Sequence, residues 1–240
     1  MIEDKLIYAI IPARSGSKGL PNKNILPLNN LPLISYSISF AKKIRYIDKI
    51  ICSTDSEKYA SISQSLGAEA PFLRSKEASQ DNSMEPEVLR DLRSSFKKHD
   101  IEEPDIVVWL RPTFPFRRIE DIMKCVEFLI ENQEYSCART VCNAESRLYK
   151  IVDNQLLPNY DDKDKSMVRR QDMIPCFKVF SADVFWFKYN KFNDDFLGQK
   201  TYPVIIDKIS GIDIDDELDY QIAKSIIESK NINLEEYVHF

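Results

Sequence analysis

The spacing of hydrophobic positions alternates between two periods along most of the chain. Short, nearly continuous apolar runs suit strands buried on both faces, and they predict strands at residues 6–11, 49–54, 71–73, 106–110, 136–142, 184–187 and 202–206. Apolar residues three or four positions apart predict helices over residues 32–44, 59–66, 88–96, 119–130 and 217–226. Strands that alternate with helices form mostly parallel sheets with helices on both faces. The sequence therefore predicts a three-layer α/β fold of the Rossmann-like kind.

This alternation breaks between residues 143 and 182. The segment contains a strand-like run at Tyr149–Val152, a turn at Asp153-Asn154 and a charged loop at residues 161–165. About 40 residues are too few to form an independent core. We therefore predict a single domain over residues 1–240, in which residues 143–182 are inserted as an arm.

The predicted arm carries apolar residues that a thin insertion cannot bury against itself. They are Leu148, Tyr149, Ile151, Leu156, Leu157, Met167, Met173 and Ile174. Exposed apolar surface usually marks a partner surface, and two-fold homodimers are the commonest oligomers. The arm therefore predicts a homodimer. The alternative is an arm that folds back on its own domain.

Composition and charge exclude several classes of protein. The 240 residues are 43% hydrophobic and 30% charged, and a net charge of −5 without a long basic run argues against nucleic acid as a partner. No apolar run approaches the roughly 18 residues that a membrane span needs. The chain reaches its first predicted strand almost at once, so we expect no signal peptide.

The histidines and cysteines narrow the chemistry further. His99 and His239 are the two histidines, and neither has a setting suited to a general base or a metal ligand, so we expect no Ser-His-Asp hydrolase. The five cysteines are odd in number and contain no Cys-x-x-Cys pair, which is typical of reduced thiols. These counts indicate a cytoplasmic protein.

The loop after the first predicted strand concentrates glycine and positive charge. Gly16 and Gly19 are two of only five glycines in the chain, and Arg14, Lys18 and Lys23 lie in the same stretch. Glycine lets the backbone approach a polyanion closely, and open α/β sheets bind ligands at the carboxyl ends of their strands. The spacing matches neither a Walker loop nor G-x-G-x-x-G. The loop predicts a cradle for a nucleoside triphosphate, with a solvated basic turn as the alternative.

Five stretches of the sequence, taken together, resemble one enzyme family. In order they are residues 13–24 (ARSGSKGLPNKN), 53–55 (STD), 74–81 (RSKEASQD), 110–117 (LRPTFPFR) and 211–219 (GIDIDDELD). They resemble the acylneuraminate cytidylyltransferases, the CMP-sialic acid synthetases, which join CTP to an α-keto sugar acid and release pyrophosphate. The resemblance implies a nucleotide-binding, nucleotidyltransferase fold in which the inserted arm is a dimerisation arm.

The resemblance also implies a nucleotide site. Its residues are Ala13, Arg14, Ser15, Gly16, Lys18, Lys23, Asn24, Arg74, Asp81 and Ser83. Arg14 and Lys18 are the expected catalytic cations, because they would neutralise the triphosphate and the charge that develops as pyrophosphate leaves. Arg74 and the stretch from Asp81 to Ser83 match the positions that recognise cytosine and ribose.

Two aspartates near the end of the chain are candidate metal ligands. Asp213 and Asp215 alternate along a strand-like segment and therefore share one face. Two such carboxylates can hold a hard divalent cation that bridges substrate phosphates, and the resemblance favours Mg²⁺ or Mn²⁺ there. The general base is then Asp215 or water on the metal. The alternative is that Asp215 or Asp216 merely caps the helix that begins near Glu217.

The resemblance places four further residues at the sugar acid. They are Arg111, Thr113, Lys150 and Arg170, of which Lys150 or Arg170 would come from the other subunit to meet the substrate carboxylate. Arg111 stands where the family commonly has glutamine, so a cationic fork replaces an amide. Its alternative role is to pair with a nearby acid, away from substrate. Phe180-Ser181 replaces an Asn-Gly pair, and N-acetylneuraminate, legionaminic-type and pseudaminic-type acids all stay open as substrates.

Two other functions stay open on the sequence alone. A nucleotidylyltransferase that uses a sugar 1-phosphate with UTP or GTP shares the logic of the cationic loop, although its loop is usually richer in glycine. A catalytically silent relative that serves as a scaffold would be expected to lose the cationic loop or the acidic pair, and this chain has both. The sequence therefore favours a cytidylyltransferase with CTP and a keto-sugar acid as its partners.

Overall fold

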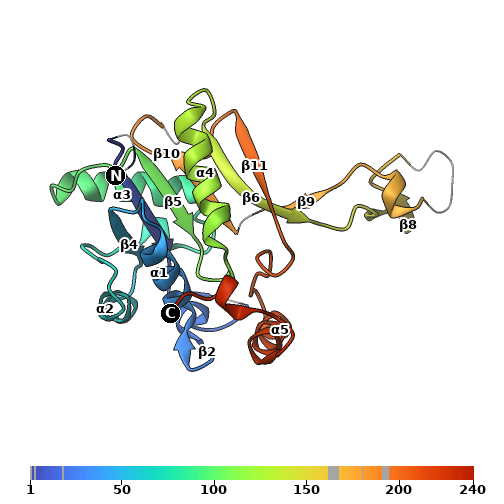
Figure 1. Ribbon diagram of the computed structural model, residues 1–240, viewed down its shortest axis with the longest axis horizontal. Coiled ribbons are helices and arrows are strands. Elements are labelled where there is room, and N and C mark those ends of the chain that lie inside the picture. The colour runs from blue at the N-terminus through green and yellow to red at the C-terminus, as the bar shows by residue number, and fades with distance from the viewer. Residues whose placement is uncertain (1, 3, 18, 162–167, 180, 191–194) are drawn as a thin grey trace.

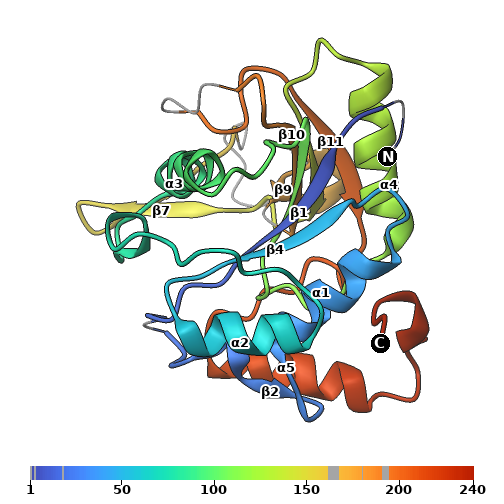
Figure 2. The same cartoon turned by 90° about the vertical axis from the view of Figure 1, so that its left-hand side faces the viewer.

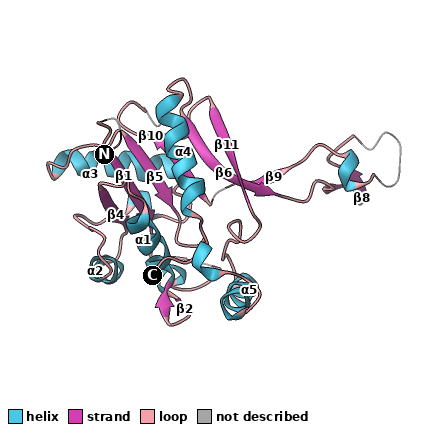
Figure 3. Ribbon diagram, viewed as in Figure 1, coloured by secondary structure: helices cyan, strands magenta, loops and turns pink. Residues whose placement is uncertain are grey.

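A sheet of seven strands forms the centre of the protein (Figure 1, Figure 3). The computed structural model describes residues 2, 4–17, 19–161, 168–179, 181–190 and 195–240. The strands follow the spatial order β11-β6-β10-β5-β1-β4, and β9 pairs with the end of β6. Their bounds are β1 Ile7–Pro12, β4 Lys49–Ser53, β5 Ile106–Leu110, β6 Cys137–Asn143, β9 Phe177–Lys178, β10 Ala182–Trp186 and β11 Thr201–Ile206.

Five of these strands point the same way, as the alternation of strands and helices predicts. β1 is parallel to both β4 and β5, and β6 is parallel to β11. β10 lies between β5 and β6 and runs against both, so β5 and β6 share one direction. The carboxyl ends of β1, β4 and β5 therefore lie at one edge of the sheet, where open α/β sheets bind ligands.

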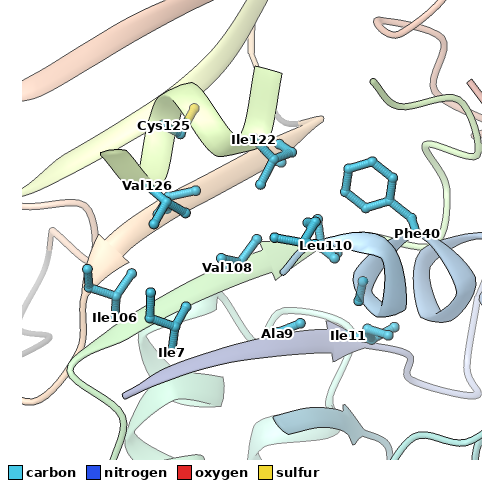
Figure 4. Close-up of a cluster of buried hydrophobic side chains, with 14 of the residues drawn as sticks. Ile7, Ala9, Ile11, Phe40, Ile106, Val108, Leu110, Ile122, Cys125 and Val126 are labelled. Atoms are coloured by element: carbon cyan, nitrogen blue, oxygen red, sulfur yellow. The ribbon is translucent and has the colours of Figure 1, made fainter. Parts of the chain in front are cut away.

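Helices cover both faces of the sheet (Figure 2). α1 (Leu33–Lys43) and α4 (Ile119–Glu131) cover one face, and α3 (Glu85–Lys98) covers the other. The first core includes Ile7, Ala9, Ile11, Phe40, Ile106, Val108, Leu110, Ile122 and Val126 (Figure 4). The second core takes the intervening residues of the same strands and includes Tyr8, Ile10, Leu89, Leu92, Phe96, Val107 and Trp109. Because successive strand residues face opposite cores, these strands read as continuous apolar runs.

A third apolar cluster joins the C-terminal part of the chain to the body. It is built from the β2–β3 hairpin (Pro27–Leu28 and Leu31–Pro32), α5 (Glu217–Glu228) and the end of the chain around the 3-10 turn η4 (Leu234–Glu236). Leu28, Phe116 and Ile214 are fully buried there. The cluster thereby places the loop before α5 beside the loops that follow β1 and β5.

The structure confirms the predicted helices. They correspond to α1, α2 (Glu57–Ser65), α3, α4 and α5. α2 is followed by Leu66 as its cap and by Gly67 at a φ of 90°, the left-handed conformation that commonly ends a helix. In the described part of the chain, no helix is both long enough and apolar enough to cross a membrane.

The strand predicted at residues 71–73 is wrong. Beside β4 the chain forms a single parallel bridge, between Ile51 and Glu69, and then leaves the edge of the sheet. Pro71 lies two residues after Glu69 and has no N–H with which to extend the pairing. Phe72 instead packs against Phe96 of α3, with ring centroids 5.8 Å apart. The apolar run at residues 71–73 is thus a packing contact of a loop.

The arm extends away from the body (Figure 1). The chain leaves the sheet after Asn143, forms the antiparallel hairpin β7–β8 (Tyr149–Val152 and Gln155–Pro158) and the 3-10 turn η3 (Arg170–Asp172), and rejoins the sheet at Phe177. Of the eight apolar residues predicted to be exposed on the arm, six are: Leu148, Tyr149, Ile151, Leu156, Leu157 and Ile174. Met173 is partly buried. Met167 lies outside the described residues. The arm therefore does not bury these groups on its own domain, and the homodimer stays a prediction.

Candidate active site

A cleft of about 540 Å³ opens at the carboxyl ends of β1 and β5. Its volume lies within the range of roughly 300–1,000 Å³ that is typical of small-ligand sites. Nine residues predicted for the site line it: Arg14, Lys23, Asn24, Arg74, Ser83, Arg111, Thr113, Asp213 and Asp215. Residues from both ends of the chain therefore meet where this fold is expected to bind a ligand.

The glycine-rich loop after β1 is fixed by polar contacts on both sides. Asp55 follows β4 and accepts hydrogen bonds from the Ser15 backbone N at 2.8 Å and the Ser15 Oγ at 2.9 Å. Farther along the loop, Asn24 Nδ2 donates to the Arg14 carbonyl oxygen at 2.9 Å. A Cβ added at Gly19 would lie 2.7 Å from the backbone oxygen of Asp215. Glycine at this position therefore lets the loop pass close to the acidic segment before α5.

Two cations of this loop face acidic partners at the cleft. Arg14 Nη1 lies 2.7 Å from Asp81 Oδ1, and both side chains are partly exposed. Lys23 Nζ lies 2.9 Å from Asp215 Oδ1. Lys18, predicted as a catalytic cation, lies outside the described residues. The described part of the loop thus presents positive charge that is already balanced by single carboxylates.

Arg74 forms part of the cleft wall and is anchored to the end of β4. Its Nε donates to Ser53 Oγ at 3.1 Å, and its Nη2 donates to the Ser53 carbonyl oxygen at 2.6 Å. Burial lowers the pKa of Arg74, and the nearby Asp55 is the main group that opposes this shift. The guanidinium thus ties the cleft wall to the sheet, and its contact with cytosine stays a prediction.

Asp213 and Asp215 lie at the cleft on either side of a buried residue. Ile214 between them is fully buried, and its backbone N donates to the Thr113 carbonyl oxygen at 2.9 Å. Burial raises the pKa of Asp213; the Thr113 hydroxyl opposes this shift by hydrogen bonding, and the charge of Asp215 adds to it. The cap of α5 is Asp216, which accepts from the Asp219 backbone N at 3.0 Å. The capping role considered for Asp215 is therefore wrong.

The acid pair fits a hard divalent cation. Asp213 Oδ1 is buried and has no hydrogen-bond partner among the described residues, so this oxygen is available as a ligand. The described residues contain no cluster of three or more His, Cys, Asp or Glu side chains that could hold a metal. Two carboxylates are nevertheless sufficient for Mg²⁺, which commonly keeps several waters and binds substrate phosphates. The metal itself stays a prediction.

Arg111 lines the cleft but is held by two acids. Its Nη1 lies 2.8 Å from Asp183 Oδ2, and its Nη2 lies 2.9 Å from Glu85 Oε1. Asp183 is fully buried and also accepts from Arg139 Nε at 2.8 Å. Burial disfavours the charge of Arg111, but Asp183 and Glu85 outweigh it and raise the pKa. The pairing with a nearby acid, considered above as the alternative for Arg111, is confirmed, and its effect on substrate stays a prediction.

Comparison with known protein families shows the family of this chain. Residues 8–202 match the family model described as cytidylyltransferase. The chain belongs to the cytidylyltransferase family. This assignment covers the loop after β1, the end of β4 and the loop after β5, which together build most of the cleft.

Two curated relatives and one solved structure agree with this family. The chain is 33% identical over 241 residues to the N-acylneuraminate cytidylyltransferase of Escherichia coli, covering 97% of this chain but only 55% of that relative, so it spans about half of the relative's length. It is 31% identical to the CMP-N,N'-diacetyllegionaminic acid synthase of Campylobacter jejuni, covering 96% and 99% of the two chains. A CMP:2-keto-3-deoxy-manno-octonic acid synthetase solved with CTP superposes with a TM-score of 0.66 at 15% identity, covering 93% and 98%. That likeness confirms the predicted α/β fold.

Several of the predicted site residues do not line the cleft. Ala13 is fully buried behind it, Ser15 is held by Asp55, and Asp81 supports Arg14. Gly16 belongs to the same loop, and a Cβ placed there would make only an ordinary contact with Arg14. These positions shape the loop, and their contact with nucleotide stays a prediction.

The two arm residues predicted for the sugar acid are placed differently. Lys150 is exposed on β7, on the arm that extends from the body, and does not line the cleft of its own chain. Arg170 begins η3, and its side chain lies outside the described part of the structure. One chain alone therefore does not bring Lys150 to the cleft, so its predicted role depends on a second subunit.

Sequence reasoning missed three acids that organise the site, namely Asp55, Glu85 and Asp183. Asp55 was visible only as part of the Ser-Thr-Asp stretch, with no sign that it holds the glycine-rich loop. Asp183 had a clearer signal, because it interrupts the otherwise apolar strand β10. A charged residue in a strand buried on both faces needs an ionic partner, and Arg139 interrupts the adjacent strand β6 in the same way.

Proposed function

We propose that this cytidylyltransferase joins CTP to an α-keto sugar acid and releases pyrophosphate. The observation that carries the proposal is the meeting, in one cleft, of the cationic loop after β1 with Asp213 and Asp215. Relatives named for N-acylneuraminate and for a legionaminic acid support a sugar acid as the acceptor. Transfer of a phosphoryl group depends mainly on positioning and on charge neutralisation, and this cleft offers both.

In this proposal the loop after β1 receives the triphosphate. Arg14, Lys18 and Lys23 bind phosphate oxygens, and Asn24 keeps the loop closed through its bond to the Arg14 carbonyl. Lys23 is only 2.9 Å from Asp215, so its ammonium can exchange a carboxylate for a phosphate as the nucleotide enters. Arg74 and Ser83 form the wall expected to face cytosine and ribose.

The chemical step follows from these positions. The anomeric hydroxyl oxygen of the sugar acid attacks the α-phosphorus, the bond from that phosphorus to the bridging oxygen breaks, and pyrophosphate leaves. Asp215 takes the hydroxyl proton, and Arg14 and Lys18 neutralise the leaving group. Asp213 and Asp215 would hold Mg²⁺ or Mn²⁺, which when bound supplies positive charge to the phosphate oxygens.

The proposal also concerns where the reaction takes place. The five cysteines are free thiols and four of them are buried, which suits the reducing cytoplasm. A CMP-sugar is an activated glycosyl donor, so the product would serve the synthesis of cell-surface polysaccharides.

A turnover assay tests the proposal directly. The purified chain would be incubated with Mg²⁺, each of the four nucleoside triphosphates and one of several acceptors: N-acetylneuraminate, a legionaminic-type acid, a pseudaminic-type acid or a sugar 1-phosphate. We expect pyrophosphate and a CMP-sugar from CTP with at least one keto-sugar acid. Pyrophosphate release only from a sugar 1-phosphate with UTP or GTP would overturn the proposal, and release from no pair would favour the scaffold.

We further propose a homodimer in which each arm serves the cleft of the other subunit. Support comes from the exposed apolar residues of the hairpin β7–β8 and from Lys150, which is exposed on the arm and does not line the cleft of its own chain. Lys150 or Arg170 would then meet the substrate carboxylate of the neighbouring site. A partner subunit would cover these exposed groups.

Mixing two inactive variants tests this sharing. One subunit carries Lys18→Ala, and the other carries both Lys150→Ala and Arg170→Ala. If sites are shared, a heterodimer contains one site with every lesion and one site with none, so activity reappears on mixing. No recovery on mixing, or a monomer by light scattering, would contradict the shared site.

A further inference from the structure

The cations around the cleft differ in how firmly each is already held. Carboxylate oxygens lie 2.7 to 2.9 Å from three of them, Arg14, Lys23 and Arg111. Lys178 on β9 is held much less closely. Its Nζ is 4.0 Å from Asp213 Oδ2, and its side chain is 46% exposed. Among these described cations, Lys178 therefore has the weakest ionic partner.

Lys178 nevertheless has a fixed place beside the cleft. Its backbone pairs with Cys142 at the end of β6, so the sheet holds its Cα. Its Nζ lies 5.8 Å from the centroid of the Phe114 ring, and both Phe114 and Asp213 line the cleft. Lys23 approaches the acid pair from the nucleotide loop, whereas Lys178 approaches it from the edge of the sheet at the base of the arm.

The chemistry of an α-keto sugar acid requires a cation at such a place. Its carboxylate is bonded to the same carbon as the anomeric hydroxyl that attacks phosphorus. The group that binds the carboxylate must therefore lie next to the pair Asp213 and Asp215, where Asp215 takes the hydroxyl proton. We propose that Lys178 of the same chain binds the carboxylate of the acceptor, an inference that rests on the proposed function.

Arg111 is less suited to this role, although it lines the cleft. To bind a carboxylate, Arg111 would have to give up a close ion pair, either at 2.8 Å with the fully buried Asp183 or at 2.9 Å with Glu85. Lys178 would give up only a 4.0 Å contact. Lys150 or Arg170 from the arm of a second subunit would bind the same carboxylate in addition to Lys178. Lys178 itself belongs to the chain that forms the cleft.

An acceptor without its negative charge isolates the contact. The assay compares kcat/KM for a keto-sugar acid and for its carboxamide in the wild-type enzyme and in Lys178→Gln. We expect Lys178→Gln to lower kcat/KM for the acid by about 10-fold or more, the range of a hydrogen bond to a charged group. The value of kcat/KM for the carboxamide should change by less than about threefold, so that Lys178→Gln loses most of the preference for the acid over the carboxamide. Lys178→Arg should retain that preference.

Two measurements separate this role from a structural one. The Kd of CTP, measured by calorimetry, should be unchanged in Lys178→Gln. Lys188→Gln serves as a matched control, because Lys188 is an exposed lysine that follows β10 and does not line the cleft. If Lys178→Gln fails to fold, Lys178→Met should lose the preference that Lys178→Arg keeps. If Lys178→Gln kept the preference for the acid, or lost affinity for CTP, the inference about Lys178 would be overturned while the proposed function would stand. A wild-type enzyme that turns over no sugar acid would overturn it together with the proposed function.

Discussion

The two sides of the cleft hold their charges in different ways. On the nucleotide side, Arg14 and Lys23 each pair with a single carboxylate that is substantially exposed. On the acceptor side, Arg111 lies between Glu85 and Asp183, and Asp183 is fully buried. An exposed pair changes partners at small cost, whereas a buried pair that loses one member is strongly destabilised. The nucleotide side is therefore suited to exchanging partners, and the acceptor side to keeping its shape.

The largest effect is expected at Asp215, which joins the two sides. Asp215→Asn should lower kcat by about 10³-fold, because it removes a metal ligand and the proposed base together. Asp213→Asn should raise the Mg²⁺ concentration needed for half-maximal rate. Initial rates across a metal titration measure both effects.

Asp216 provides a control beside the acid pair. Asp216→Ala removes the cap of α5 and should lower the free energy of unfolding by about 1 kcal/mol while the rate stays near that of the wild type. Wild-type metal dependence in both Asp213→Asn and Asp215→Asn would show that this segment only supports the helix.

The next largest effect tests the buried network. Asp183→Ala should lower the free energy of unfolding by about 3–5 kcal/mol, because Arg111 and Arg139 lose the buried carboxylate that they share. Asp81→Ala removes the exposed partner of Arg14 and should cost less than about 1 kcal/mol. Urea denaturation of both variants gives the comparison. Equal losses of stability would remove the difference between the two sides.

Features that depend on local sequence could be predicted, and features that depend on distant residues could not. The body of the fold was predictable because apolar spacing is a local property, and β5 and α4 are where the spacing places them. The strand at residues 71–73 was not, because an apolar run does not reveal that Pro71 ends the pairing after Glu69. Whether one residue pairs with the edge of a sheet depends on the neighbouring strand, which the local sequence does not show.

The site was predictable where its residues belong to recognisable stretches. The loop after β1 and the segment before α5 do meet in the cleft. The ionic partners of Arg111 were beyond local reasoning, since Asp183 lies 72 positions away in the sequence. Lys178 was missed for a similar reason, because it approaches Asp213 only after the arm has returned the chain to β6.

A smaller effect is expected from Lys18 on the nucleotide side. Its place between the two glycines of the loop motivates the prediction that Lys18→Ala lowers kcat by about 10²-fold, with little change in stability. Lys43→Ala is the matched control, because Lys43 is an exposed lysine at the end of α1. Near-normal turnover by a folded Lys18→Ala enzyme would contradict the assignment of this loop to the triphosphate.

The smallest effect is expected from Arg111 on nucleotide binding. Arg111→Gln should change the KM of the sugar acid or the preferred acid, because it alters the wall of the cleft between Glu85 and Asp183. The Kd of CTP should stay within about threefold of the wild-type value, on the order of 0.7 kcal/mol, since Arg111 pairs with Glu85 and Asp183, which lie outside the loop after β1. Asp183 keeps Arg139 as a partner in this variant, so the fold should persist for the measurement. Calorimetry with CTP and initial rates with a panel of acids separate the two sides. A large loss of CTP affinity would place Arg111 on the nucleotide side, and the division of the cleft into an exchanging side and a fixed side would then be wrong.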